Sequence, residues 1–399
     1  MAKRSDSNKT NQAKVLEYLY RKQQSSRIDL ARDTQLTPAA ITHLTSHFIE
    51  ENKIIETGDQ FRIKKGSGRS RKVLTLNSDY CYFLGIEINS NGISSVLTNV
   101  IGKQIDQNHI AHRDYHKDDI NATLIALIKQ MLDKHSEKYI HSIGLAVPGH
   151  FDQETGTIVS NNHIWQHFNL SQIKKEISLP IVIDNNIECM ALGEYLFNPL
   201  NTPDNYLFMH IGPGLFCSFF DSSRITSKSN FYIGEIGHTV VDINGPQCEC
   251  GKRGCLQTYI STTWLIQYAE LLYQSNPSSA IKNLIDKPED ITLETIITAY
   301  QLGDSFLVDK IDTGLKLLAT SIANTLILYD ANKVYINSDL LNHLDFKEKL
   351  LEQIREQLNF IPNKTDLEIE ILPFDDYRGA RGACALSAYV NYIKQGLED

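Results

Sequence analysis

Three cysteines and one histidine form the most specific chemical pattern in the chain. Cys248, Cys250 and Cys255 lie within eight residues, and His238 precedes the first of them by ten residues. Three thiolates and an imidazole are the ligand set of a closed, tetrahedral structural zinc site. Because no ligand position remains open for water, we expect Zn²⁺ to brace this loop rather than to catalyse a reaction. Three reduced cysteines without an ion are the alternative.

The other four cysteines are scattered singly, as is typical of small buried residues. Such a distribution favours a reducing compartment, and no apolar run approaches the ~18 residues that a membrane span needs. The start of the chain is polar and basic, without the apolar segment of a secretory signal. We therefore expect a cytoplasmic protein that does not enter a membrane.

Composition and charge divide the 399 residues into two parts. The chain is 42% hydrophobic and 22% charged, which excludes general disorder. Residues 1–76 hold 15 Lys and Arg against 8 Asp and Glu, a net charge of +7, so residues 77–399 carry a net −16. This asymmetry indicates a head that binds a polyanion and an acidic body.

The basic head has the pattern of three short helices. An apolar stripe at helical spacing runs through residues 10–22, and residues 26–29 form a capping box for a second helix. The pair Thr37-Pro38 marks the start of a third helix, over residues 38–52. A short polar gap separates helices two and three, as in a helix-turn-helix that binds double-stranded DNA. The residues that we expect to face the DNA groove are Thr37, Ala39, Thr42, His43 and Ser46.

A hairpin and a basic stretch follow the third helix. Residues 54–55 and 61–63 flank the cluster 57–59, which we expect to form the turn. The next segment, KKGSGRSRK, suits a wing whose cations lie along DNA phosphates. These cations are Lys64, Lys65, Arg69, Arg71 and Lys72. A three-helix docking domain with a basic linker is the alternative.

The acidic body alternates between strand and helix patterns. Strands are expected in residues 81–103 (two), 141–152, 180–184, 205–220 (two), 333–336 and 366–374, and helices in 120–138, 187–197, 263–330 and 379–394. This order predicts α/β layers with helices on both faces of the sheets. Around 320 residues suit two lobes with a cleft between them.

The segments GEIGH and CECGKRGC resemble the zinc-binding signature of the ROK family, whose members are repressors, open reading frames and kinases. The resemblance runs nearly end to end. It implies a body (residues 77–399, with the zinc motif at 238–255) of two α/β lobes with the actin/hexokinase-like ATPase fold. It also implies that residues 1–76 are the winged helix-turn-helix of the repressor branch.

The resemblance further implies a sugar pocket. Asn162 lies in a segment similar to PNLxW, and Asn185 and Asn186 lie at the ENDAN motif. Glu235 and His238 belong to ExGH, with His238 also a metal ligand, and Gln257 takes a position that the family usually fills with Glu. Amides and carboxylates are suited to the hydroxyls of a sugar or sugar phosphate, because each hydroxyl both donates and accepts.

Four departures from the family argue against kinase activity. Asn186 replaces the Asp that serves as general base, a role typically worth ~10²–10⁴-fold in rate. The phosphate loop after the first strand, residues 87–91, lacks its paired Gly and its Thr. In the second loop, residues 212–218, a proline removes an N–H donor and a phenylalanine adds bulk. Asn337-Ser338 replaces a Gly-Gly pair near the expected adenine site. The pattern predicts no catalytic residues.

The sequence as a whole therefore predicts a sugar-responsive repressor of carbohydrate-utilisation genes that is not an enzyme. Its expected partners are an operator DNA, a sugar or sugar phosphate, and a second copy of itself in a homodimer or a tetramer. Two other functions stay open. One is an ATP-dependent sugar kinase with a DNA-binding head. The other is a repressor switched by a sugar-transporter protein.

Overall fold

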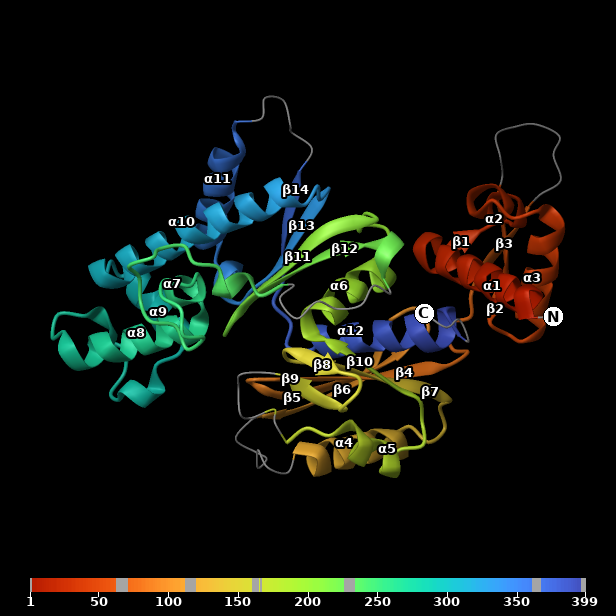
Figure 1. The fold of residues 1–399 in the computed structure, drawn as a ribbon, viewed down its shortest axis with the longest axis horizontal. Coiled ribbons are helices and arrows are strands. Elements are labelled where there is room, and N and C mark those ends of the chain that lie inside the picture. The colour runs from red at the N-terminus through yellow and green to blue at the C-terminus, as the bar shows by residue number, and fades with distance from the viewer. Residues whose placement is uncertain are drawn as a thin grey trace. The chain divides into compact units, whose positions relative to one another are not determined.

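A computed structural model shows that the chain folds into two compact units (Figure 1). The structure describes residues 2–61, 71–111, 120–159, 165, 167–225, 234–360 and 367–395. The first unit comprises Met1–Thr202 and Asp376–Asp399, and the second comprises Pro203–Asp375. The chain therefore crosses between the units twice.

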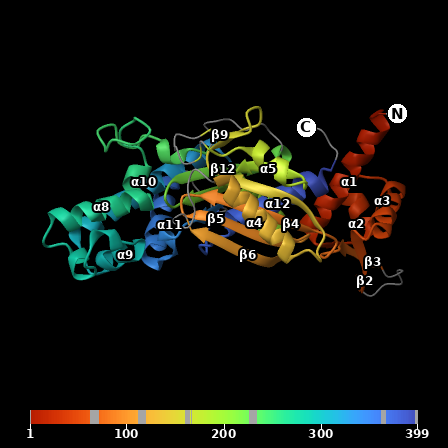
Figure 2. The same ribbon diagram turned by 90° about the horizontal axis from the view of Figure 1, so that it is seen from below.

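The head of the first unit is a winged helix-turn-helix, as the sequence predicts. Its elements are α1 (Ala2–Lys22), β1 (Gln24–Ser25), α2 (Arg27–Thr34), α3 (Pro38–Glu50), β2 (Ile54–Phe61) and β3 (Arg71–Leu76). The Ser26 hydroxyl accepts a hydrogen bond from the Asp29 amide at the start of α2. The Thr37 hydroxyl accepts one from the Ala40 amide at the start of α3. These caps satisfy amides that have no partner within their own helix. The three helices cluster together in Figure 2.

The turn predicted at residues 57–59 is wrong. Strand β2 continues through this cluster, and its pairing with β3 shifts between Thr57 and Gln60. Gly58 and Asp59 are thus accommodated as a bulge, in which extra residues bend one strand without ending it. The connection between β2 and β3 is the segment 62–70, which lies outside the described residues.

A five-stranded mixed sheet forms the centre of the first unit. Its strands lie in the order β10-β7-β4-β5-β6, and β4, β7 and β10 are parallel. Helices α4 and α5 cover one face, and α6 and α12 cover the other (Figure 1). The bounds are β4 (Tyr82–Asn89), β5 (Gly92–Asn99), β6 (Gln104–Ala111), α4 (Ile120–Lys134), β7 (Ile140–Val147), α5 (Leu170–Glu176), β10 (Ile181–Asn185), α6 (Asn186–Phe197) and α12 (Arg378–Ser387). A small hairpin, β8 (His150–Asp152) and β9 (Thr157–Val159), and a π-helical segment, η9 (Ala388–Ile393), complete the unit.

Helix α12 packs directly on the backbone of this sheet. A Cβ at Gly85 of β4 would lie 1.9 Å from the Ala380 carbonyl oxygen, and one at Gly144 of β7 would lie 1.9 Å from that of Ala383. Only glycine permits so close an approach of helix to strand. Residues from the end of the described chain thus complete a layer whose strands come from its first half.

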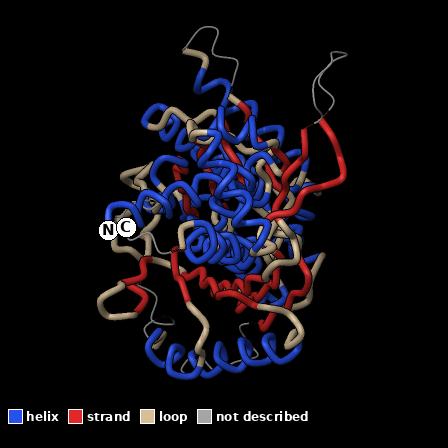
Figure 3. The backbone as a smooth tube through the Cα atoms, turned by 90° about the vertical axis from the view of Figure 1, so that its right-hand side faces the viewer, coloured by secondary structure: helices blue, strands red, loops and turns tan. Residues whose placement is uncertain are grey.

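The second unit has a four-stranded sheet and most of the remaining helices. The strands β11 (Asn205–Ile211), β12 (Leu215–Asp221), β13 (Lys333–Asn337) and β14 (Glu368–Leu372) lie in the order β12-β11-β13-β14. The helices are α7 (Gln257–Ile260), α8 (Thr262–Ser275), α9 (Leu293–Gln301), α10 (Ser305–Leu328) and α11 (Leu344–Leu358), with 3₁₀ turns η4 (Ser222–Arg224), η5 (Ile236–His238), η6 (Ala280–Asn283), η7 (Pro288–Asp290) and η8 (Leu340–Asn342). Figure 3 shows strands and helices intermixed, as in the α/β class predicted.

Within the described residues, α10 is the one helix long and apolar enough to span a membrane. Nine of its 24 residues are buried, and Ile311, Leu315 and Leu318 among them belong to the apolar core of the second unit. This burial is typical of a core helix in a folded domain.

Candidate functional site

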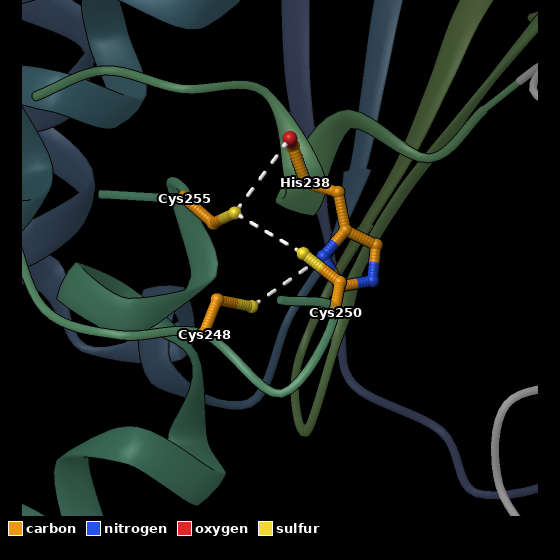
Figure 4. Close-up of side chains that lie close together, drawn as sticks. All are labelled: His238, Cys248, Cys250 and Cys255. Carbon is orange, nitrogen blue, oxygen red and sulfur yellow. Dashed lines mark hydrogen bonds between the residues drawn. The ribbon is translucent and has the colours of Figure 1, made fainter. Parts of the chain in front are cut away.

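The four predicted metal ligands converge in the second unit (Figure 4). The ligand atoms of His238, Cys248, Cys250 and Cys255 all lie within 4.8 Å of one another. The Cys248 sulfur is 3.6 Å from His238 Nδ1, and the sulfurs of Cys250 and Cys255 are 3.6 Å apart. Burial lowers the pKa of His238, which favours the neutral imidazole that binds metals. The cluster could therefore hold one metal ion.

The backbone conformation of this loop requires glycine. Gly251 and Gly254 have φ angles of 88° and 67°, a region that other residues adopt at a cost. A Cβ at Gly254 would lie only 1.5 Å from the Asp242 carbonyl oxygen, whereas one at Gly251 would meet no atom within 4 Å. Gly254 is thus required both by its backbone conformation and by the space around it.

Two predicted sugar ligands flank the metal cluster. Glu235 immediately precedes the 3₁₀ turn that carries His238, and burial raises the pKa of its carboxyl. Gln257 is buried at the start of α7. Its amide nitrogen lies 3.6 Å from the Cys248 sulfur and also donates to the Glu249 carboxylate. Any shift of the metal loop would therefore move both residues.

The first unit holds a second polar cluster, where strands β4 and β10 end. The Asn186 amide nitrogen donates to Glu87 Oε1 and to the Ile88 carbonyl oxygen, both at 3.1 Å. The Asn185 oxygen caps α6 by accepting from the Ile187 amide at 2.8 Å. The carboxyl ends of parallel strands meet at one edge of a sheet, where α/β folds usually bind ligands.

One atom of this cluster has no partner. Asn186 Oδ1 is buried, and no described residue donates a hydrogen bond to it. An unpaired buried carbonyl oxygen costs free energy that a hydroxyl donor would recover. The atom is therefore a candidate acceptor for a ligand hydroxyl.

Sequence reasoning missed two carboxyls in this region. Glu87 is only 2% exposed and accepts from Asn186, although 99 residues separate them. Asp184 accepts from the Asn185 amide at 2.7 Å, and burial raises its pKa. The signal for both is an acidic residue within an otherwise apolar strand.

The predicted sugar residues are thus distributed over both units. Asn185 and Asn186 lie in the first unit, and Glu235, His238 and Gln257 lie in the second. Asn162 lies outside the described residues. A common pocket for these six residues stays a prediction.

The loops expected to have lost their nucleotide contacts form tight turns. Of the residues 212–218, only 212–214 form a turn, in which the Gly212 amide donates to the Gly214 carbonyl oxygen at 3.1 Å, whereas 215–218 belong to β12 and pair with β11. Asn337, at the end of β13, is 1% exposed, and its amide nitrogen lies 3.1 Å from His210 Nδ1. This amide is thus already engaged within the unit's own core.

The DNA-binding residues predicted on α3 lie together on one face of the head. Thr37, Ala39, Thr42 and His43 are exposed, and Ser46 is half-buried. The helix adjoins a groove of about 900 Å³ whose other wall comes from α1. The residues lining this groove are Asn8, Gln12, Pro38, Ala39, Thr42, His43, Ser46, His47 and Glu50.

Sequence reasoning missed the contribution of α1 to this groove. Asn8 and Gln12 lie about one turn apart, near the start of a helix recognised only by the apolar stripe further along it. Amide side chains donate to phosphates and pair with adenine edges. The available signal is this pair of amides at i and i+4, which continues the face of the apolar stripe toward the start of the helix.

The predicted wing is described only in part. Lys64, Lys65 and Arg69 lie outside the described residues, and only the backbone of Arg71 is described. Lys72 on β3 is exposed and pairs with Glu56 at 2.5 Å. Glu56 also accepts from Arg27 at 2.9 Å, so this part of the wing is partly neutralised.

The family model described as "ROK family" matches residues 83–389. The chain is 26% identical to a xylose repressor of Caldicellulosiruptor bescii, over 90% of this chain and 91% of that one. It is 25% identical to the DNA-binding transcriptional dual regulator NagC of Escherichia coli, over 90% of this chain and 88% of the regulator.

Solved structures share the fold. A ROK family transcriptional regulator, a homologue of the E. coli MLC protein, covers 97% of this chain with a TM-score of 0.76 at 24% identity, and 98% of that chain is matched. A ROK family glucokinase from Streptomyces griseus, solved with glucose and AMPPNP, covers 76% of this chain and matches over 98% of its own length, with a TM-score of 0.61 at 21% identity. The fold of the body is thus that of the actin/hexokinase-like sugar kinases, and the regulator's fold extends over the head as well.

Proposed function

Because the chain belongs to the ROK family, we propose that it is a sugar-responsive, DNA-binding repressor of carbohydrate-utilisation genes. The observation that carries this proposal is the extent of the match. Relatives named as repressors align over 90% of the chain, which includes at least part of the head, whereas the glucokinase fold covers 76% of it. The head distinguishes the two branches, and α3 on that head presents an exposed polar face.

The DNA would lie against the groove between α1 and α3. In this interaction the N-terminal part of α3 enters the major groove, where Thr42 and His43 reach base edges. Asn8 and Gln12 on the opposite wall contact the adjacent backbone, and the wing cations contact phosphates. A homodimer would place two such heads on the half-sites of a pseudo-palindrome.

The sugar would bind to the polar residues predicted from the sequence. Asn186 Oδ1, buried and without a donor, supports a hydroxyl contact in the first unit. The other members of the proposed site are Asn162, Asn185, Glu235, His238 and Gln257. A sugar hydroxyl satisfies such an acceptor and can donate or accept elsewhere.

The body would bind sugar without phosphorylating it. An amide has no basic lone pair with which to take a proton from a sugar hydroxyl, and the Asn186 nitrogen is committed to Glu87 and Ile88. Glu87, the carboxyl that contacts Asn186, is engaged by that amide. The geometry thus supports recognition rather than proton transfer.

The metal would be a structural zinc ion held by His238, Cys248, Cys250 and Cys255. Tetrahedral Zn–S bonds of about 2.3 Å place two sulfurs about 3.8 Å apart, and the sulfurs of Cys250 and Cys255 are 3.6 Å apart. The donor set of three sulfurs and one nitrogen also suits this ion. Its role would be to fix the loop that carries Glu235 and adjoins Gln257.

The test is binding of the purified protein to the DNA upstream of its own gene, followed by fluorescence anisotropy. We expect binding to weaken by at least about tenfold between 50 and 200 mM salt, because phosphate contacts release counterions. A panel of xylose, N-acetylglucosamine, glucose and their phosphates should contain a sugar that changes the DNA affinity. His43→Ala should lose preference for this DNA, whereas Lys129→Gln on α4 should behave as wild type.

Absent or salt-insensitive DNA binding would contradict the proposal. A coupled ADP assay on the same sugars provides the second measurement. Turnover with ATP would show that the body is still a kinase.

A further inference from the structure

Arg21, at the end of α1, connects the DNA-binding head to the rest of the first unit. Its guanidinium donates from Nη1 to the carbonyl oxygens of Tyr195 at 3.0 Å and Pro199 at 3.3 Å, and from Nη2 to that of Thr202 at 2.7 Å. The guanidinium carbon also lies 4.3 Å from the centre of the Tyr195 ring. One side chain of the head thus holds three carbonyls that are 174 or more residues away in sequence.

The position of Arg21 explains why an arginine suits this contact. Helix α6 ends at Phe197, and the last carbonyls of a helix have no partner within it and carry the negative end of its dipole. A cation with several donors in a planar fork satisfies both the hydrogen bonds and the charge. Lysine would supply the charge but not the fork.

Other contacts around Arg21 fasten the same part of α1. Glu17 accepts from the Tyr195 hydroxyl at 3.2 Å and lies 3.5 Å from the Lys394 ammonium. Tyr20 is buried, and its ring meets that of Tyr392 edge-on at 6.4 Å. The end of α1 is therefore docked on α6 and on the end of η9.

Thr202, one of the residues that Arg21 contacts, lies at the boundary between the two units. It is the last residue of the first unit before the chain enters the second at Pro203. Its hydroxyl hydrogen-bonds to the carbonyl oxygens of Glu194 and Asn198 at 3.1 and 2.8 Å, which ties the crossing point to the end of α6. Any rotation of one unit against the other must be absorbed at the crossings, as at the hinges of other two-unit proteins.

Helix α6 also begins at the candidate sugar residues. Asn186 is its first residue, and Asn185 is its N-cap. Arg21 therefore contacts the C-terminal end of α6, the helix whose first turn would bind sugar. It also contacts Thr202, the residue through which a rotation of the second unit would be transmitted.

We propose that Arg21 is a positioning residue that couples sugar binding to DNA affinity by holding the head on the end of α6 and on the crossing residue Thr202. This proposal rests on the function proposed above. Coupling requires that the Arg21 contacts differ in strength between the sugar-bound and sugar-free states. Arg21 itself touches neither ligand in this scheme.

The experiment compares wild type with Arg21→Gln, using the sugar from the panel above that raises the thermal stability of the wild type. For each protein, the DNA dissociation constant is measured with and without that sugar, and the sugar dissociation constant is measured by calorimetry. We expect wild type to show a change in DNA affinity of about 5- to 150-fold, the usual range of such coupling. In Arg21→Gln that ratio should fall below about twofold, while the sugar affinity stays within about threefold.

Two further variants make the result specific. Lys22→Gln removes a neighbouring charge from α1 and should retain the full wild-type ratio. Arg21→Lys keeps the charge without the fork and should give an intermediate ratio, which also provides the answer if Arg21→Gln does not fold. A ratio equal to wild type in Arg21→Gln, or in Arg21→Lys when only that variant folds, would overturn the proposal. A wild-type protein that binds no DNA or ignores every sugar would instead overturn the function on which it rests.

Discussion

The polar sites of the two units are held in place by different means. In the second unit, all four metal ligands come from one segment, residues 238–255, which is organised by one 3₁₀ turn and two isolated bridges. In the first unit, Glu87 and Asn186 come from distant segments aligned by the parallel ladder through β4, β7 and β10. With the proposed zinc, the loop would depend on an ion, whereas the other site depends on a sheet. Removing one ion should collapse the first arrangement and leave the second intact.

The largest expected effect comes from the metal. Cys250→Ser should abolish stoichiometric zinc binding and destabilise the second unit by about 5 kcal/mol or more, since structural zinc contributes about 10–16 kcal/mol in zinc-finger peptides. Sugar binding should be lost as well, because Glu235 and Gln257 adjoin the loop. Metal content by mass spectrometry and thermal unfolding provide the measurements. Cys217→Ser, in the same unit but outside the cluster, should keep the metal. A metal-free wild type would contradict this expectation.

The next prediction separates the contribution of the metal loop's backbone conformation to stability from the contribution of the ion. Gly254→Ala should destabilise the second unit by about 3 kcal/mol, because a positive φ and a clash with the Asp242 carbonyl oxygen add together. Gly251→Ala has a similar φ and open space, so it should cost only about 1 kcal/mol. Urea unfolding of both variants gives the difference. Equal losses of stability in the two variants would mean that the clash with the Asp242 carbonyl oxygen does not contribute.

A third prediction tests the polar cluster of the first unit, which contains Glu87 and Asn186. Asn186→Ala should lower sugar affinity by about tenfold, the worth of a hydrogen bond or two, without changing the metal content. Asn89→Ala is the matched control at the end of the same sheet. Its side chain accepts from the Asn91 and Gly92 amides and forms a turn, so sugar affinity should be unchanged. Calorimetric titration measures both, and an unaltered affinity in Asn186→Ala would remove this residue from the pocket.

The smallest effect depends on pH. Burial raises the pKa of Asp184 above its unfolded value of about 3.9, so the folded state holds the proton more tightly. The resulting stability is present below about pH 3.9 and is lost as the pH rises through the folded pKa. Asp184→Asn has no such loss, so its stability relative to wild type should increase in urea unfolding as the pH rises above about 3.9.

Asp152→Asn provides a control of opposite sign. The Glu154 amide, which donates to the Asp152 carboxylate, lowers the pKa of that exposed group. Its stabilisation is present above the unfolded pKa and is lost as the pH falls, so this variant should lose stability relative to wild type as the pH rises. The same trend in both variants would contradict the assignment.

The sequence predicts features whose partners are close along the chain. Cys248, Cys250 and Cys255 are recognisable because a metal loop needs short spacings, and the start of α3 is recognisable from Thr37-Pro38. The predicted turn at 57–59 is wrong because a glycine followed by an aspartate suits a bulge as well as a turn. Strand β6 was not predicted, because Gln104–Ala111 is a polar strand at the edge of the sheet.

Features that depend on distant partners could not be predicted from local patterns. Nothing near Glu87 indicates that it receives a hydrogen bond from Asn186, and nothing near Arg21 indicates a partner at Thr202. Their pairing is a consequence of the sheet order and of the way α1 packs on α6. The part of the candidate site that lies in the second unit was therefore visible in the sequence, whereas the internal support of the first unit was not.

The close packing of α12 on Gly85 and Gly144 has a consequence for synthesis on the ribosome. Residues 376–393 complete the helical layer of the first unit, but they are translated only after the whole second unit has been made. At about 5–20 residues per second, the nascent head waits at least about 15 seconds for this layer and for its contact with Tyr392. A chain whose translation stops early would carry a head that can reach the end of α6 but lacks its contacts with Tyr392 and Lys394.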